Sequence, residues 1–199
     1  MTLANGFLAL VRKATTDLDI DRLNVEVRAF AERHPEWTTR RKAEWLIQRT
    51  ARRAAAVGAI ASLPPGWAAV AAMGPELSAL LIMQSRLILS LHLLYGGVPE
   101  PEERALEVLA GLATGAGINV GRRLTTRAAE ELAERVVARL VGRELSHFVP
   151  ILGAAAAAAL NYVAVRAVGR AAAHRVERLY GPPELPGTGP LLDATGRVL

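Results

Sequence analysis

The sequence predicts an all-α fold: a compact multi-helix domain around a central, apolar helical hairpin rich in small residues (54–96). Hydrophobic residues make up 51% of the 199 residues, yet aromatic residues make up only 5%. This composition favours close-packed helices over β-sheets, which are enriched in aromatic and β-branched residues. Proline and glycine divide the chain into helix-sized segments. A chain of this length supports one domain with a real core.

Prolines and glycines mark most of the expected helix ends. Pro64 and Pro65 must interrupt the hairpin, because consecutive prolines remove amide donors and clash with the preceding turn. Gly142 and Gly181 are expected to end the last two helices. The expected helices cover 19–34, from 35–39 to about 62, from 67 or 75 to 95, from 101 into 111–121, from 125 or 126 to about 141, and about 149–180.

Three parts of the chain differ in composition. Residues 1–36 form an N-terminal helical segment, in which Leu23, Val27 and Phe30 recur at amphipathic spacing. Residues 37–180 form the main helical domain, and the Pro- and Gly-rich residues 181–199 are expected to be a disordered tail. The N-terminus lacks the pattern of an export signal, so we expect a cytoplasmic protein.

Charge-free stretches raise the question of membrane spans. Ala54–Pro75 and Leu145–Val165 are long enough to cross a bilayer. However, two prolines break the first stretch, and the second is rich in alanine, which contributes little to insertion. The most apolar run, Leu77–Leu94, contains Arg86. One arginine near the bilayer centre costs about 2.5–3.5 kcal/mol. Peripheral association is therefore favoured over a transmembrane helix.

A basic segment precedes the apolar part of the hairpin. Its six cations and one acid, Glu44, leave an excess of +5, which equals the formal net charge of the whole chain. Such clusters attract phosphate groups of lipids or nucleic acids, although a simple solvated helix face remains an alternative. The cations, which we treat as candidates for anionic lipid or phosphate binding, are Arg40, Arg41, Lys42, Arg49, Arg52 and Arg53.

Four polar residues in apolar surroundings form a second candidate site: Glu76, Arg86, His92 and Asn161. If buried, charged residues need partners. One interpretation is that they pair with neighbouring helices and set the helix register. The other is a polar site that contacts a ligand or a lipid headgroup.

Recognisable catalytic motifs are missing from the sequence. No H-E-x-x-H or G-x-S-x-G pattern occurs, and the absence of cysteine excludes thiolate metal sites and disulfides. A cluster of glycines matches neither the P-loop motif nor the dinucleotide-binding motif; its members are Gly111, Gly115, Gly117 and Gly121. They are better explained as two small-residue spacings, 111/115 and 117/121, that let helices pack closely. We therefore expect no cofactor and no metal, and the sequence favours a non-enzymatic protein over an enzyme.

Nucleic-acid binding is not favoured either. Trp37 and Trp45 flank the basic segment and could stack on bases. No helix-turn-helix, zinc or RNP-like pattern accompanies them, and the core is unusually apolar for such a module.

Several of these features together resemble the EcsC protein family. The apolar segment Ala55–Pro75 is followed by Glu76, by Arg86 ten residues later, and by Tyr95-Gly96. A later V-P-I-L-G-A segment starting at Val149, with Asn161 beyond it, is also similar to the family. The resemblance covers about residues 40–180, with Glu76 where the family usually has Asp. The resemblance implies a helical, mainly bacterial protein that associates with membranes and has no settled biochemical activity.

These observations lead to one main hypothesis and two alternatives. The main hypothesis is a non-enzymatic module that binds an anionic membrane surface or a protein partner, at the inner face of the cell membrane. One alternative is a hydrolase or other enzyme that uses Glu76, Arg86, His92 and Asn161. The other is a purely structural helical protein.

Overall fold

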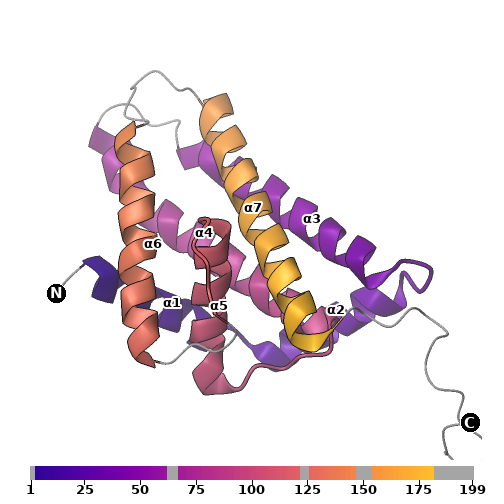
Figure 1. Cartoon of the computed structure of the whole chain (residues 1–199). Helices are drawn as coiled ribbons and strands as arrows, with labels where there is room; N and C mark the ends of the chain where they lie inside the picture. The colour runs from indigo at the N-terminus through magenta and orange to yellow at the C-terminus, as the bar shows by residue number, and fades with distance from the viewer. Residues whose placement is uncertain (1–2, 62–66, 122–125, 147–153, 182–199) are drawn as a thin grey trace, which may run out of the picture.

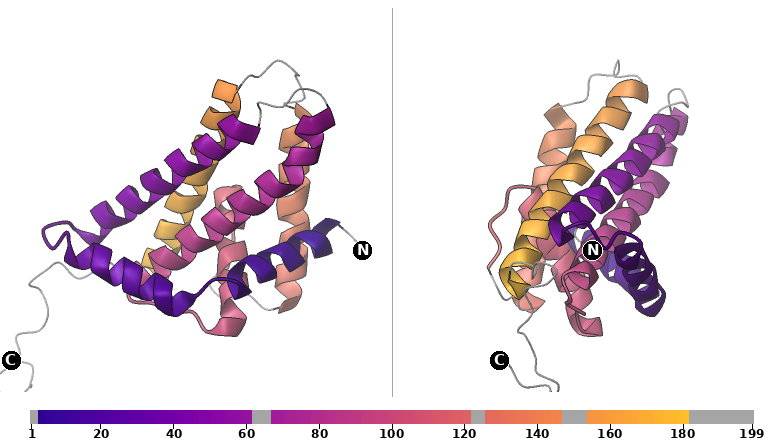
Figure 2. Two further views of the ribbon diagram at one scale, coloured as in Figure 1. Left: turned by 180° about the vertical axis from the view of Figure 1, so that it is seen from behind. Right: turned by 90° about the vertical axis from the view of Figure 1, so that its right-hand side faces the viewer.

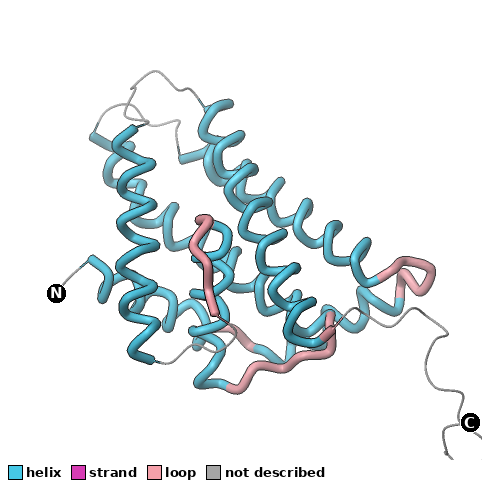
Figure 3. Tube along the Cα trace, in the orientation of Figure 1, coloured by secondary structure: helices cyan, strands magenta, loops and turns pink. Residues whose placement is uncertain are grey.

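The computed structural model describes residues 3–61, 67–121, 126–146 and 154–181. Over these residues the chain forms seven α-helices and no strand (Figures 1 and 3), which confirms the all-α prediction. The helices are α1 (Leu3–Thr16), α2 (Ile20–Glu32), α3 (Thr39–Ala61), α4 (Trp67–Leu94), α5 (Pro101–Gly115), α6 (Thr126–Ser146) and α7 (Ala154–Tyr180).

The helices pack around α4, which contacts α1, α2, α3, α5 and α7. Helices α3 and α7 lie side by side, as the right panel of Figure 2 shows, and have the most extensive helix–helix contact. Helix α6 packs on α1 and α5 instead. The two arms of the predicted hairpin, α3 and α4, contact each other, whereas its turn at 62–66 and the side chains of 60–77 lie outside the described residues.

Local signals account for most of the observed helix ends. The Asp19 carboxylate caps α2 by accepting a hydrogen bond from the Arg22 amide at 2.9 Å. Pro101 starts α5, where its missing amide hydrogen costs nothing. Helix α4 begins at Trp67, the earlier of the two predicted starts, and its backbone continues through Pro75. Gly96, with φ +82°, ends that helix as predicted.

Two predictions of helix position differ from the structure. Helix α6 does not end near Val141 but continues through Gly142 to Ser146. An isolated glycine costs a helix only about 1 kcal/mol, which the rest of α6 offsets. The N-terminal segment holds a separate helix, α1, before the predicted one, and α1 buries Leu8 and Val11. The expected start of α7 near 149 and the tail at 182–199 lie outside the described residues.

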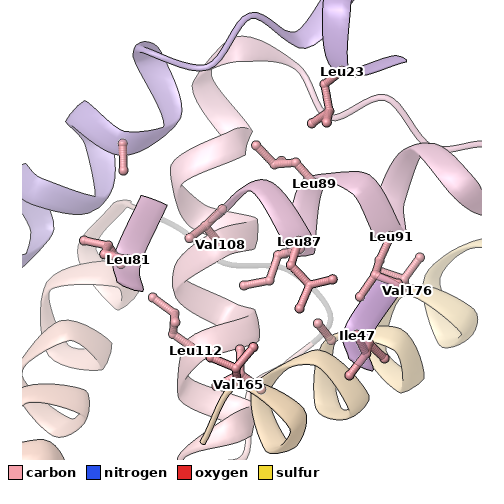
Figure 4. Packing of buried hydrophobic residues seen from close by; sticks show 14 of the residues in the cluster. Leu23, Ile47, Leu81, Leu87, Leu89, Leu91, Val108, Leu112, Val165 and Val176 are labelled. Atoms are coloured by element: carbon pink, nitrogen blue, oxygen red, sulfur yellow. The ribbon is translucent and has the colours of Figure 1, made fainter. Parts of the chain in front are cut away.

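The core consists of two adjoining clusters that share helices α1 and α5. The larger cluster joins Val11 and Leu23 of the N-terminal segment to Ile47, Leu87 and Val165 of later helices; Figure 4 shows the packing. The smaller cluster joins α1 and α5 to α6. Helices α1 and α2 thus contribute buried side chains to the same core as the helices of the main domain. None of the described helices is long and apolar enough to cross a membrane.

Small residues let the helices of this core approach closely. A Cβ atom on Gly115 would lie 2.6 Å from the Cα atom of Val168, and one on Gly111 would lie 2.8 Å from Ile88. The predicted packing role of the 111/115 spacing is therefore confirmed. The prediction that the 117/121 spacing packs helices together is wrong, because Gly117 has φ +77° and belongs to the turn after α5.

Candidate functional site

The structure divides the basic segment of α3 into paired and unpaired charges. Arg40 donates from Nε to Glu177 Oε1 on α7 at 2.9 Å, and this hydrogen bond raises the pKa of Arg40. Glu44, the acid of the segment, also faces α7, where it accepts from Arg170 and Arg166 at 3.0 and 3.1 Å. The hydrogen bond from Arg170 is the main cause of the lowered pKa of Glu44. Both contacts therefore hold α3 against α7.

The other five cations lie on the side of α3 that is not buried against α7 and α4. We call this set the basic face. None of its members forms an ion pair with another described residue. At 100° per residue they spread over about 120° of the helix, opposite the buried Ala43, Ile47 and Ala54. The basic face consists of Arg41, Lys42, Arg49, Arg52 and Arg53.

Aromatic rings support the N-terminal half of the basic face. Trp45 stacks on Phe30 of α2 with ring centroids 4.6 Å apart, and the Arg49 guanidinium lies 5.1 Å from the centre of the Trp45 ring. Trp37 stacks on His34 at 4.1 Å, and Arg41 lies 4.6 Å from its ring. The two indoles thus join α2 to α3 and orient arginines by cation–π contact. This packing occupies the rings that base stacking would require.

The four polar residues predicted as a second site are not brought together. Arg86 is 45% exposed and pairs with Glu26 of α2. The Asn161 side chain donates to the backbone oxygen of Ala54 on α3 at 3.4 Å. His92 is buried among α4, α5 and α7, and the side chain of Glu76 lies outside the described residues. The described members contact three different neighbours, so no common site forms among them.

His92 instead belongs to a polar cluster that the sequence analysis missed, in which His92 and Arg175 are buried. Its Nε2 atom lies 3.6 Å from Glu107 Oε2 of α5, and its Nδ1 atom lies 3.2 Å from the Tyr180 hydroxyl of α7. A carboxylate beside Nε2 favours the proton on that nitrogen, which leaves Nδ1 to accept from the hydroxyl. Arg175, also on α7, donates to both oxygens of Glu107 at 3.1 and 3.2 Å and to the Gly121 carbonyl at 2.9 Å.

Burial governs the protonation of this cluster. Desolvation lowers the pKa of His92 from 6.5 to about 4, although Glu107 acts to raise it and Arg175 lowers it further. Desolvation also raises the pKa of Tyr180. His92 is therefore neutral at physiological pH, as a buried imidazole beside an ion pair should be.

The cluster acts as a clamp that holds the C-terminal end of α7 on α4 and α5. His92 is only 1% exposed, so its ring has no access to a substrate. Gly97 leaves room for the Tyr180 ring, which occupies the place where a Cβ atom would stand. The sequence contains one signal for the cluster, an acid inside the apolar run around Glu107. Its arginine is 68 residues away, so no local pattern connects the two.

The described residues give little support for a cofactor or metal site. Among them, no three histidine, aspartate or glutamate side chains lie close enough to hold a metal ion. One surface depression is bordered by Arg135 and Arg139, and another by Asn24 and Arg28. Neither is lined by a residue of the His92 cluster or of the basic face. The five cations of the basic face therefore remain the candidate site that the sequence predicted.

No protein-family model, curated protein or solved structure matches this chain. The resemblance to the EcsC family therefore stays a prediction from the sequence.

Proposed function

We propose that this protein is a non-enzymatic helical module that associates peripherally with anionic membrane surfaces through the basic face of α3. The observation that carries the proposal is the separation of charges on this helix. Arg40 and Glu44 are engaged by α7, while the five cations of the basic face have no acidic partner among the described residues. Cations held in one face on a rigid helix attract a surface of lipid phosphates.

This proposal extends to the location of the protein. The leaflet that carries anionic lipid towards a cytoplasmic protein is the inner face of the cell membrane. A bacterial origin and membership of the EcsC family agree with this role, and both belong to the proposal. A basic face of this kind also suits an acidic protein surface, and the absence of binding to anionic vesicles would leave that alternative.

Flotation with vesicles tests the proposal. The purified chain should float with vesicles of phosphatidylserine in phosphatidylcholine, not with phosphatidylcholine alone, and added salt should weaken the binding. Each basic residue near an anionic surface contributes about 1 kcal/mol. Reversing Arg49, Arg52 and Arg53 to Glu should therefore weaken binding on the order of a hundredfold.

A matched control keeps the overall charge equal. Reversal of Arg12, Arg28 and Arg139, which are exposed on α1, α2 and α6, removes the same six charge units. Both triple variants thus change the formal net charge from +5 to −1. If both lose binding equally, net charge and not the basic face is responsible. If the wild-type protein shows no preference for anionic vesicles, the proposal fails.

A further inference from the structure

An unusual apolar strip runs along the exposed side of α7. Val163 is 63% exposed and Leu160 is 46% exposed. Isolated exposed apolar residues are common, but these belong to a set on one helix face without a charge among them. The apolar strip consists of Ala159, Leu160, Val163, Ala164 and Ala167. Beyond it, the same face becomes polar with Arg170 and His174.

The contacts between α3 and α7 place this strip beside the basic face. The helices are antiparallel, because Glu44 pairs with Arg170 whereas Ala54 accepts from Asn161. Equal rise per residue then puts Arg52 level with Val163.

Both residues also lie on the solvent side of the helix–helix seam. On α3, Arg52 is rotated about 80° from Glu44, away from the buried Ala51. On α7, Val163 is rotated only about 20° from Arg170, which is 53% exposed. The cations of α3 and the apolar strip of α7 therefore form one continuous surface; the right panel of Figure 2 shows the two helices side by side.

We infer that the apolar strip of α7 inserts into the headgroup–acyl boundary of an anionic bilayer while the basic face of α3 contacts the lipid phosphates. This inference rests on the proposed function and adds the orientation of the protein and a second, apolar contribution to binding. Apolar side chains beside cations match a bilayer surface, which offers both negative charge and hydrocarbon.

A second copy of the chain fits this surface less well. A symmetric dimer through the same patch would bring two basic faces towards each other. Like charges in that arrangement repel, whereas an anionic bilayer attracts all five cations. The positive charge of this surface therefore favours an anionic bilayer over a second copy of the chain as its binding partner.

The test compares two double variants of the full chain. Leu160→Gln with Val163→Gln removes the exposed apolar groups of the strip. The matched control is Leu10→Gln with Val25→Gln, because Leu10 is 45% and Val25 is 68% exposed, on α1 and α2. The strip variant should bind phosphatidylserine-containing vesicles roughly tenfold more weakly than the control. Its remaining binding should be lost in high salt, where the wild-type protein retains part of its binding.

A fluorescent label gives an independent readout of insertion. The chain has no cysteine, so Val163→Cys introduces a single labelling site, and Val25→Cys provides the control. An environment-sensitive dye at residue 163 should shift to the blue with anionic vesicles, while the dye at residue 25 should not.

The outcomes separate this inference from the proposed function. If the charge reversal on α3 abolishes binding but the strip variant binds like the wild-type protein, the inference is overturned and the proposed function stands. If wild-type protein does not bind anionic vesicles, both fail. Loss of a dimer in the strip variant, seen by light scattering with unchanged lipid binding, would identify a second copy as the occupant and overturn the inference.

Discussion

Protonation of His92 should destabilise the protein over a defined pH range. The pKa of this side chain is about 4 in the folded protein, against 6.5 without the fold. Between these values the unfolded chain binds a proton that the folded protein does not, so the free energy of unfolding falls as the pH falls. The stability that the neutral, buried His92 contributes is fully present above about pH 6.5 and fully lost below about pH 4. At about 1.4 kcal/mol per pH unit, the loss is about 3 kcal/mol.

Urea unfolding at a series of pH values measures this effect. Carboxylates such as Glu44, whose pKa is lowered, also titrate at the acid end of the range, so the informative quantity is a difference between variants. His92→Gln keeps a polar group near Tyr180 and removes the titration. From about pH 7 to about pH 4, wild-type protein should lose about 3 kcal/mol more than this variant.

A second histidine on the surface provides the control for this experiment. His174→Gln removes an exposed histidine from the same helix as Tyr180 and serves as the matched control for loss of an imidazole. Parallel pH profiles for wild type and His92→Gln would refute the reasoning. They would mean that burial beside Glu107 and Arg175 does not keep the imidazole neutral.

Two further substitutions test the packing and the buried ion pair. Gly115→Ala brings a Cβ atom 2.6 Å from the Val168 backbone and should cost about 1–3 kcal/mol in thermal denaturation. Gly6→Ala, with nothing within 4 Å, should be neutral or stabilise α1 by up to about 1 kcal/mol, and equal effects would contradict this account. Glu107→Gln leaves the Arg175 guanidinium buried without its carboxylate and should cost about 3–5 kcal/mol in urea unfolding. A loss no larger than that of an exposed pair, at most about 1 kcal/mol, would argue against a buried clamp.

Local sequence signals determined the helical class and several helix boundaries. The apolar spacing of α2, the proline at the start of α5 and Gly96 at the end of α4 act over a few residues, so they can be recognised without the fold. Gly142 shows the limit of such signals. The cost of one glycine inside a helix is small enough for the rest of α6 to override.

The sequence by itself also located the basic segment, but only the tertiary structure decided which of its charges are available. Arg40 and Arg52 are both arginines of the same basic segment, and nothing in the sequence distinguishes their roles. In the structure Arg40 contacts Glu177, 137 residues away, whereas Arg52 faces solvent. The His92 cluster likewise combines residues from α4, α5 and α7. Helix periodicity specifies which residues share a face of one helix. Which helix covers that face depends on the packing of the whole core, and this packing decides where charges are paired, buried or exposed.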